Sequence, residues 1–176
     1  MSESAEQRFD QLWTDHAPAV VRYARRHVHP DDVEDVVAET FVVAWRRLDE
    51  VPAFGLPWLL GVARHVSANV RRGHRRRDAL AAKVGTEPAD DPVWPVAGHD
   101  DAVTAALHQL SDADRELLTL ITWDGLSHEE AAEALDCSRG ALKVRLHRAR
   151  RRLAALLDGS PSAVAVLPFP TPGGAE

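Results

Sequence analysis

The chain has 176 residues, one cysteine and a formal net charge of −6 at pH 7. This length allows one domain or two small ones, and a single cysteine excludes an internal disulfide and fits a reducing compartment. No run approaches membrane-spanning length, and residues 1–8 are too polar for a signal peptide, so we expect a cytoplasmic protein that does not enter a membrane. Runs of alternating β-branched residues are nearly absent, which predicts an all-α fold.

The first two predicted helices are separated by a proline break. Apolar residues recur at helical spacing over residues 9–28, but Pro18 interrupts the pattern and should kink the helix or start a second one there. After Pro30, the next helix should begin with Asp31 as its N-cap and Glu34 completing a capping box. The inward face of this helix is predicted at Val33, Val36, Val37, Thr40, Phe41, Ala44 and Leu48.

A loop and a basic helix are predicted next. The loop spans Val51–Leu56, and Pro57 suits the first turn of a third helix. Gly73 should end this helix, and an arginine block follows it. The inner stripe of the helix is predicted at Leu59, Val62, Ala63, Val66 and Val70.

Proline and glycine then mark the boundary between two small helical domains. We predict one domain over residues 5–77, a flexible linker over 78–100 and a second domain over 101–157. Residues 158–176 are rich in proline, glycine, serine and alanine, so we expect a disordered tail.

The second domain should contain a helix-turn-helix. Ser111 can cap one helix and Gly125 can end it; Ser127 then begins a short helix, with Glu130 three residues on as a capping box. Asp136 and Cys137 form a tight turn, and Ser138 can cap a second helix. The core stripe of that helix is predicted at Leu142, Leu146, Ala149, Leu153 and Leu156, and its other faces carry Arg139, Lys143, Arg145, Arg148, Arg150, Arg151 and Arg152. Basic charge concentrated on this helix favours DNA binding despite the negative net charge.

These segments together resemble an extracytoplasmic-function sigma factor of bacterial RNA polymerase. Residues 31–48, which begin Asp-Asp-Val-Glu-Asp-Val-Val, and residues 57–64, Pro-Trp-Leu-Leu-Gly-Val-Ala-Arg, are similar to region 2 of that family. Residues 110–118, 123–132 and 140–150 are similar to region 4, the last reading Gly-Ala-Leu-Lys-Val-Arg-Leu-His-Arg-Ala-Arg. The order of the segments and the linker between them also match.

The resemblance implies two roles for the first domain. An acidic face formed by Asp32, Asp35 and Glu39 would bind core RNA polymerase at its clamp. The −10 promoter element would be read and opened by residues that match the family's single-strand contacts, which here are Phe54, Arg64, His65, Arg71 and Arg72. Phe54 would either stack on a flipped base or fold back onto the core.

The second domain would read the −35 element with its basic helix. The matching positions are Ser138, Arg139, Gly140, Lys143, Arg145 and Arg148. Arg139 and Lys143 are the candidates for base edges, because Arg and Lys pair with guanine acceptors, and Arg145 and Arg148 would hold phosphates. The expected partners are core RNA polymerase and promoter DNA, and family members are commonly held by an anti-sigma factor.

Two other classes of function fit parts of the sequence. The helix-turn-helix alone would fit a transcriptional regulator that acts without polymerase, but residues 31–77 and the lack of a sensor domain argue against it. An enzyme is disfavoured, because the carboxylates of residues 31–39 fan around one helix and no phosphate loop or nucleophile motif is present. We therefore expect a non-catalytic initiation factor with no metal and no cofactor.

Overall fold

The computed structural model describes residues 4–84 and 101–157. These residues form helices, turns and short connections without a strand, which confirms the all-α prediction. The chain divides into an N-terminal unit, residues 1–95, and a C-terminal unit, residues 96–176. Residues 85–100 of the predicted linker and the predicted tail 158–176 lie outside the described residues. Within the described part, no helix is both long and apolar enough to cross a membrane.

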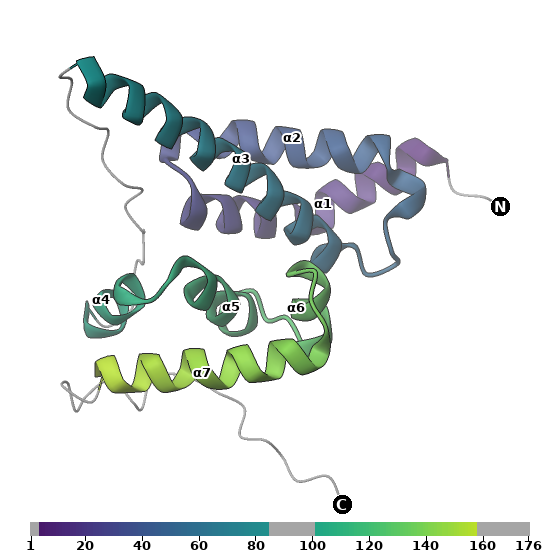
Figure 1. The fold of residues 1–176 in the computed structure, drawn as a ribbon. Helices are drawn as coiled ribbons and strands as arrows, with labels where there is room; N and C mark the ends of the chain where they lie inside the picture. The colour runs from purple at the N-terminus through teal and green to yellow at the C-terminus, as the bar shows by residue number, and fades with distance from the viewer. Residues whose placement is uncertain (1–3, 85–100, 158–176) are drawn as a thin grey trace, which may run out of the picture. The chain divides into compact units, whose positions relative to one another are not determined.

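Three helices pack against one another in the N-terminal unit (Figure 1). They are α1 (Ala5–His27), α2 (Val33–Arg46) and α3 (Gly55–Val84), with short 3-10 helices η1 (Pro30–Asp32) and η2 (Leu48–Glu50) on either side of α2. The predicted inward face is confirmed, since all seven of its residues are buried, although Leu48 lies in η2 and not in α2. The core that this face completes is built mainly from Val20, Tyr23, Ala24, Val36, Phe41, Leu59, Leu60 and Ala63.

Of the two outcomes predicted at Pro18, the start of a second helix was wrong, because α1 runs through Pro18 as one helix. Pro18 lacks an amide hydrogen, but Ala17, Ala19 and Val20 around it are buried, and α1 packs on both α2 and α3. This burial offsets the lost hydrogen bond.

The cap predicted at Asp31 was also wrong. Asp31 lies inside η1, its side chain is 89% exposed, and its backbone N–H donates to His29 Nδ1 at 3.4 Å. The helix α2 begins after Asp32, which makes no side-chain capping bond. A short 3-10 turn therefore carries the chain from Pro30 into α2, in place of a capping box.

The end predicted at Gly73 was wrong as well, since α3 continues to Val84. The predicted inner stripe of α3 holds only in part: Leu59 and Ala63 are buried, but Val62, Val66 and Val70 are half-exposed. Leu60 and Ser67 are buried beside the first two instead. The buried face of α3 is therefore rotated slightly from the prediction, and the three valines lie at its edge.

Four helices form the C-terminal unit, in which α7 packs against the other three (Figure 1). They are α4 (Asp101–Gln109), α5 (Asp112–Thr122), α6 (His128–Ala134) and α7 (Arg139–Leu157). The predicted cap at Ser111 is confirmed, as its side chain accepts from the backbone N–H of Asp114. The core consists mainly of Val103, Ala106, Leu107, Leu117, Leu118, Leu120, Ala131, Leu135, Leu142, Leu146, Ala149, Leu153 and Leu157.

Candidate nucleic-acid interface

The predicted helix-turn-helix is present, and local hydrogen bonds fix its first helix. The backbone N–H of Glu130 donates to Ser127 Oγ at 3.2 Å, and the N–H of Ser127 donates to Glu130 Oε2 at 2.8 Å. This reciprocal pair is the predicted capping box. These hydrogen bonds favour the charged carboxylate and so lower the pKa of Glu130. Gly125, with φ of 70°, lets the chain turn sharply before this helix.

The turn between α6 and α7 depends on one left-handed residue. Asp136 has φ of 48°, a conformation that aspartate tolerates better than most residues. The N–H of Cys137 then donates to the carbonyl of Ala132 at 3.0 Å, and Ser138 Oγ accepts from the N–H of Ala141 at 3.2 Å. The predicted turn and the predicted cap of the second helix are therefore both formed.

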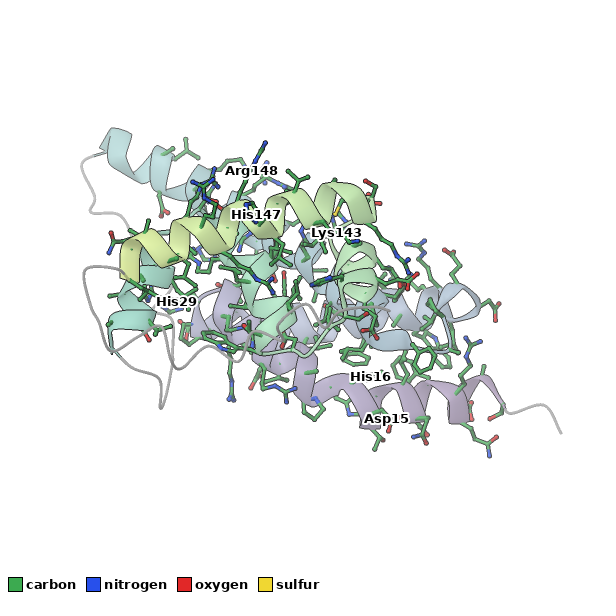
Figure 2. All side chains as sticks on the ribbon, turned by 90° about the horizontal axis from the view of Figure 1, so that it is seen from below. Asp15, His16, His29, Lys143, His147 and Arg148 are labelled. Carbon is green, nitrogen blue, oxygen red and sulfur yellow. The ribbon has the colours of Figure 1, made fainter. Side chains whose placement is uncertain are left out.

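The basic helix α7 is held by a buried stripe on one side. Leu142, Leu146, Ala149 and Leu153 are buried as predicted, but Leu156 is 37% exposed and Leu157 takes its place in the core. The helix carries six arginines and one lysine and no acidic residue. Lys143, His147 and Arg148, which lie along this helix in Figure 2, are exposed. The geometry gives a rigid cationic helix with one face available to a ligand.

Two of the α7 arginines pair with acids of neighbouring helices. Arg152 forms an ion pair and hydrogen bond with Asp114 of α5, whose side chain is 11% exposed. Arg139, at the start of the helix, forms an ion pair with Glu129 of α6, and both side chains remain largely exposed. Arg139 is therefore accessible but already has a charged partner, whereas Arg152 anchors α7 to α5.

On the N-terminal unit, the predicted acidic face divides into two parts. Asp35 and Glu39 are exposed on α2, and the part of the chain that the structure describes records no ion pair for either. Asp32 Oδ2 instead lies 2.9 Å from His74 Nε2 on α3. Asp32 therefore links η1 to α3, while Asp35 and Glu39 present their charge to solvent.

The residues predicted to meet single-stranded DNA are not brought to one point. Phe54 lies in the loop before α3 and is 81% exposed, so it does not fold back onto the core. Arg64 follows ten residues later, which is about 15 Å along a helix axis. Along α3, Arg64 and Arg71 share one stripe, and His65 and Arg72 share another about 100° away.

Hydrogen bonds engage Arg71 and Arg72 of this set. Arg71 is half-buried and donates to the carbonyl oxygen of His27 at 3.2 Å, at the end of α1. Arg72 is exposed and bonds to Asn69 one turn earlier. Arg71 therefore stabilises the packing of α3 on α1, and Arg72 and His65 are the more accessible members of the set.

A groove of about 790 Å³ between α2 and α3 was missed from the sequence. Its floor includes Val62, Val66 and Val70, the residues expected in the core, and its α2 wall includes Asp35 and Glu39. The remaining lining residues are Ala38, Val42, Val43, Arg47, His65 and Asn69. The half-exposure of the three valines was not evident from periodicity, because a stripe at the edge of a buried face has the same spacing as one at its centre.

The fold and the charge distribution define a DNA-binding protein with two helical units. A family model of sigma-70 region 2 matches residues 12–77, and one of sigma-70 region 4 matches residues 100–153. The N-terminal match covers the part of the chain with the acidic α2 and the loop of Phe54. The C-terminal match covers the helix-turn-helix.

Similar proteins align with most of this chain. RNA polymerase sigma factor NccH of Alcaligenes xylosoxydans xylosoxydans is 35% identical over 86% of this chain and 88% of its own length. ECF RNA polymerase sigma factor SigL of Mycobacterium tuberculosis is 33% identical over 81% of this chain and 84% of its own. The solved structure of CnrH in complex with the cytosolic domain of CnrY is 31% identical, with a TM-score of 0.61 over 86% of this chain and 88% of that one. The chain belongs to the sigma-70 family of RNA polymerase sigma factors, in its extracytoplasmic-function (ECF) group.

Proposed function

We propose that this sigma factor binds core RNA polymerase through its N-terminal unit and uses both units to place the polymerase at a promoter. The observation that carries the proposal is the pairing of a region 2 unit, with an exposed acidic helix, and a region 4 unit, with a basic recognition helix, in one chain. Initiation factors of this family do not catalyse a reaction themselves. We place the protein in the cytoplasm, where the polymerase and the promoter are.

The polymerase contact is assigned to α2. Asp35 and Glu39 are exposed and separated by one helical turn, so they can face one basic surface together. Asp32 shares its charge with His74 and contributes to the same face less directly. Charge complementarity of this kind raises the association rate, and the electrostatic attraction that it provides weakens as the salt concentration rises.

The −10 contact is assigned to Phe54, His65 and Arg72, with Arg64 and Arg71 alongside. An aromatic ring that is 81% exposed in a loop is suited to stack on an unpaired base. His65 and Arg72 lie on one stripe of α3 and can bind phosphates or base edges of a separated strand.

The −35 contact is assigned to the start of α7. Ser138, Arg139, Gly140 and Lys143 lie in its first turns, where recognition helices of this kind meet base edges. Arg145 and Arg148 follow and would hold phosphates. Gly140 has open space where a Cβ would be, so the backbone can approach the DNA closely there.

An anti-sigma factor is proposed as a third partner. The similar protein CnrH was solved in complex with the cytosolic domain of CnrY. The valine-floored groove between α2 and α3 is the surface of this chain that we assign to such a partner. A partner bound there would cover Asp35 and Glu39 and would exclude polymerase.

In vitro transcription with core polymerase over a promoter library tests the proposal. We expect defined start sites only when both the chain and core polymerase are present, and no promoter-specific footprint from the chain alone. Arg139→Ala and Lys143→Ala should each reduce −35 base discrimination by about 1–3 kcal/mol. Arg148→Ala is the matched control, since loss of a phosphate contact weakens binding evenly. A specific footprint without polymerase would instead favour an independent regulator.

A further inference from the structure

One apolar side chain lies in the middle of the basic surface of α7. Val144 is apolar and 51% exposed, and its neighbours in the sequence, Lys143 and Arg145, are both basic. A single exposed valine is common on protein surfaces and needs no explanation by itself. The position of Val144 on the helix, relative to the buried stripe, is what gives it significance.

Helical geometry places Val144 at the centre of the outward face. The five buried residues of α7 are Leu142, Leu146, Ala149, Leu153 and Leu157. With 3.6 residues per turn, their mean direction is about 180° from that of Val144. Gly140 and Arg148 lie about 40° to either side of Val144, and Lys143 and Arg145 about 100° to either side. The side chain that points most directly away from the core is therefore apolar, with cations on both flanks.

A helix in the major groove directs this outward centre at the edges of the base pairs, and long side chains around the centre can reach either base edges or phosphates. The apolar feature that the major groove offers is the 5-methyl group of thymine. Gly140, one turn before Val144, has nothing within 4 Å of an added Cβ, so no side chain would hold the helix away from the groove. Valine in a helix has one preferred χ1 rotamer, so it loses little side-chain entropy when it packs.

We propose that Val144 is a specificity-determining residue that packs against the 5-methyl group of a thymine in the −35 element. The inference rests on the proposed function, because it needs α7 to enter the major groove as part of the polymerase holoenzyme. It adds a preference for one base that none of the basic side chains supplies. Valine has no donor or acceptor, so a guanine or cytosine edge at this position would lose hydration without gaining a hydrogen bond.

Uracil substitution tests the contact directly, because uracil lacks the 5-methyl group and keeps every hydrogen-bonding group of thymine. The experiment uses holoenzyme assembled from the full chain and core polymerase, with a promoter selected from the library. Each thymine of the −35 element, on either strand, is replaced in turn by deoxyuridine. Binding of the holoenzyme to each substituted promoter is measured by competition with the unsubstituted promoter. Loss of one buried methyl group should weaken wild-type binding about fourfold at one position.

The variant Val144→Ala should bind the thymine promoter about fourfold more weakly and should no longer distinguish thymine from uracil at that position. Leu156→Ala is the matched control, since it removes an exposed apolar side chain near the end of the same helix and should keep the difference. The inference is overturned if no uracil position affects the wild type, if Val144→Ala keeps the full difference, or if it weakens all DNA equally, as a contact with polymerase would. It is also overturned if the selected element contains no thymine. If only the Val144 contact is wrong, the holoenzyme still selects promoters from the library. If the proposed function is wrong, the holoenzyme selects no promoter at all.

Discussion

Replacing Leu142 by alanine should strongly destabilise the C-terminal unit, whereas replacing Val144, two residues away on the same helix, should not. The side chain of Leu142 is fully buried, and that of Val144 is 51% exposed. Truncation of a buried leucine costs about 2–5 kcal/mol. A unit of about 60 residues has about 3–9 kcal/mol of stability in total, so this loss is a large part of it. An exposed truncation stays within about 0.5 kcal/mol.

Amide hydrogen exchange with mass spectrometry measures this difference, because it reports each unit separately within the intact chain. Peptides of α5, α6 and α7 in Leu142→Ala should exchange at least about thirtyfold faster, which corresponds to 2 kcal/mol. Peptides of α1, α2 and α3 should be unchanged in both variants, which gives an internal control. Equal acceleration by Leu142→Ala and Val144→Ala would refute the burial pattern, and with it the assignment of the outward face of α7.

Three further results are expected. Phe54→Ala should slow promoter opening, which is measured by the permanganate reactivity of unpaired thymines. It should not change the free energy of unfolding, because Phe54 is 81% exposed. Unchanged opening would contradict a role of Phe54 in binding the separated strand. Asp35→Asn should weaken core polymerase binding most at low salt, whereas Asp31→Asn should have little effect; equal losses would point to net charge alone. Hydrogen bonds with Ser127 lower the pKa of Glu130, so they stabilise the fold above the ordinary glutamate pKa and are lost as pH falls through the lowered value. The difference in the free energy of unfolding between wild type and Glu130→Gln should therefore shrink as the pH falls from 7 to below 4. The change should be less than about 1 kcal/mol at this exposed site. A difference that grows as the pH falls would contradict a lowered pKa of Glu130.

The elements predicted best were those in which a local rule and the tertiary fold agree. The inward face of α2 and most of the buried stripe of α7 follow helical periodicity, which depends only on the chain's own geometry. The capping box of Ser127 and Glu130 and the cap at Ser138 are formed within four residues, so sequence spacing is enough to identify them.

The second helix predicted at Pro18 and the helix end predicted at Gly73 were wrong for a tertiary reason. Each residue weakens a helix locally, by about 3 and about 1 kcal/mol. Around Gly73, however, Arg71 binds the carbonyl of His27, and His74 pairs with Asp32, so the turns on both sides are attached to the end of α1 and to η1. Interactions between residues more than forty positions apart cannot be read from a local window.

The same limit applies to the candidate site. Sequence identifies which charges lie on a helix, but it does not identify which of them find partners within the protein. Asp32 and Arg71, both predicted to contact other molecules, are bound to other parts of the chain, whereas Asp35 is exposed on α2. In contrast, the outward position of Val144 follows from the spacing of the buried stripe alone, so it can be predicted from the sequence.

The pairing of Arg139 with Glu129 has a consequence for base selection in the proposed complex. Both side chains are largely exposed, so their ion pair is worth about 0–1 kcal/mol. A bidentate contact of arginine with guanine gives about 1–3 kcal/mol, which is enough to draw Arg139 away from Glu129. A base that offers one acceptor forms one hydrogen bond with the guanidinium in place of two, so it competes less well with the ion pair. We therefore expect Arg139 to leave Glu129 at guanine and to stay paired at other bases, so that an acid on α6 increases the selectivity of an arginine on α7.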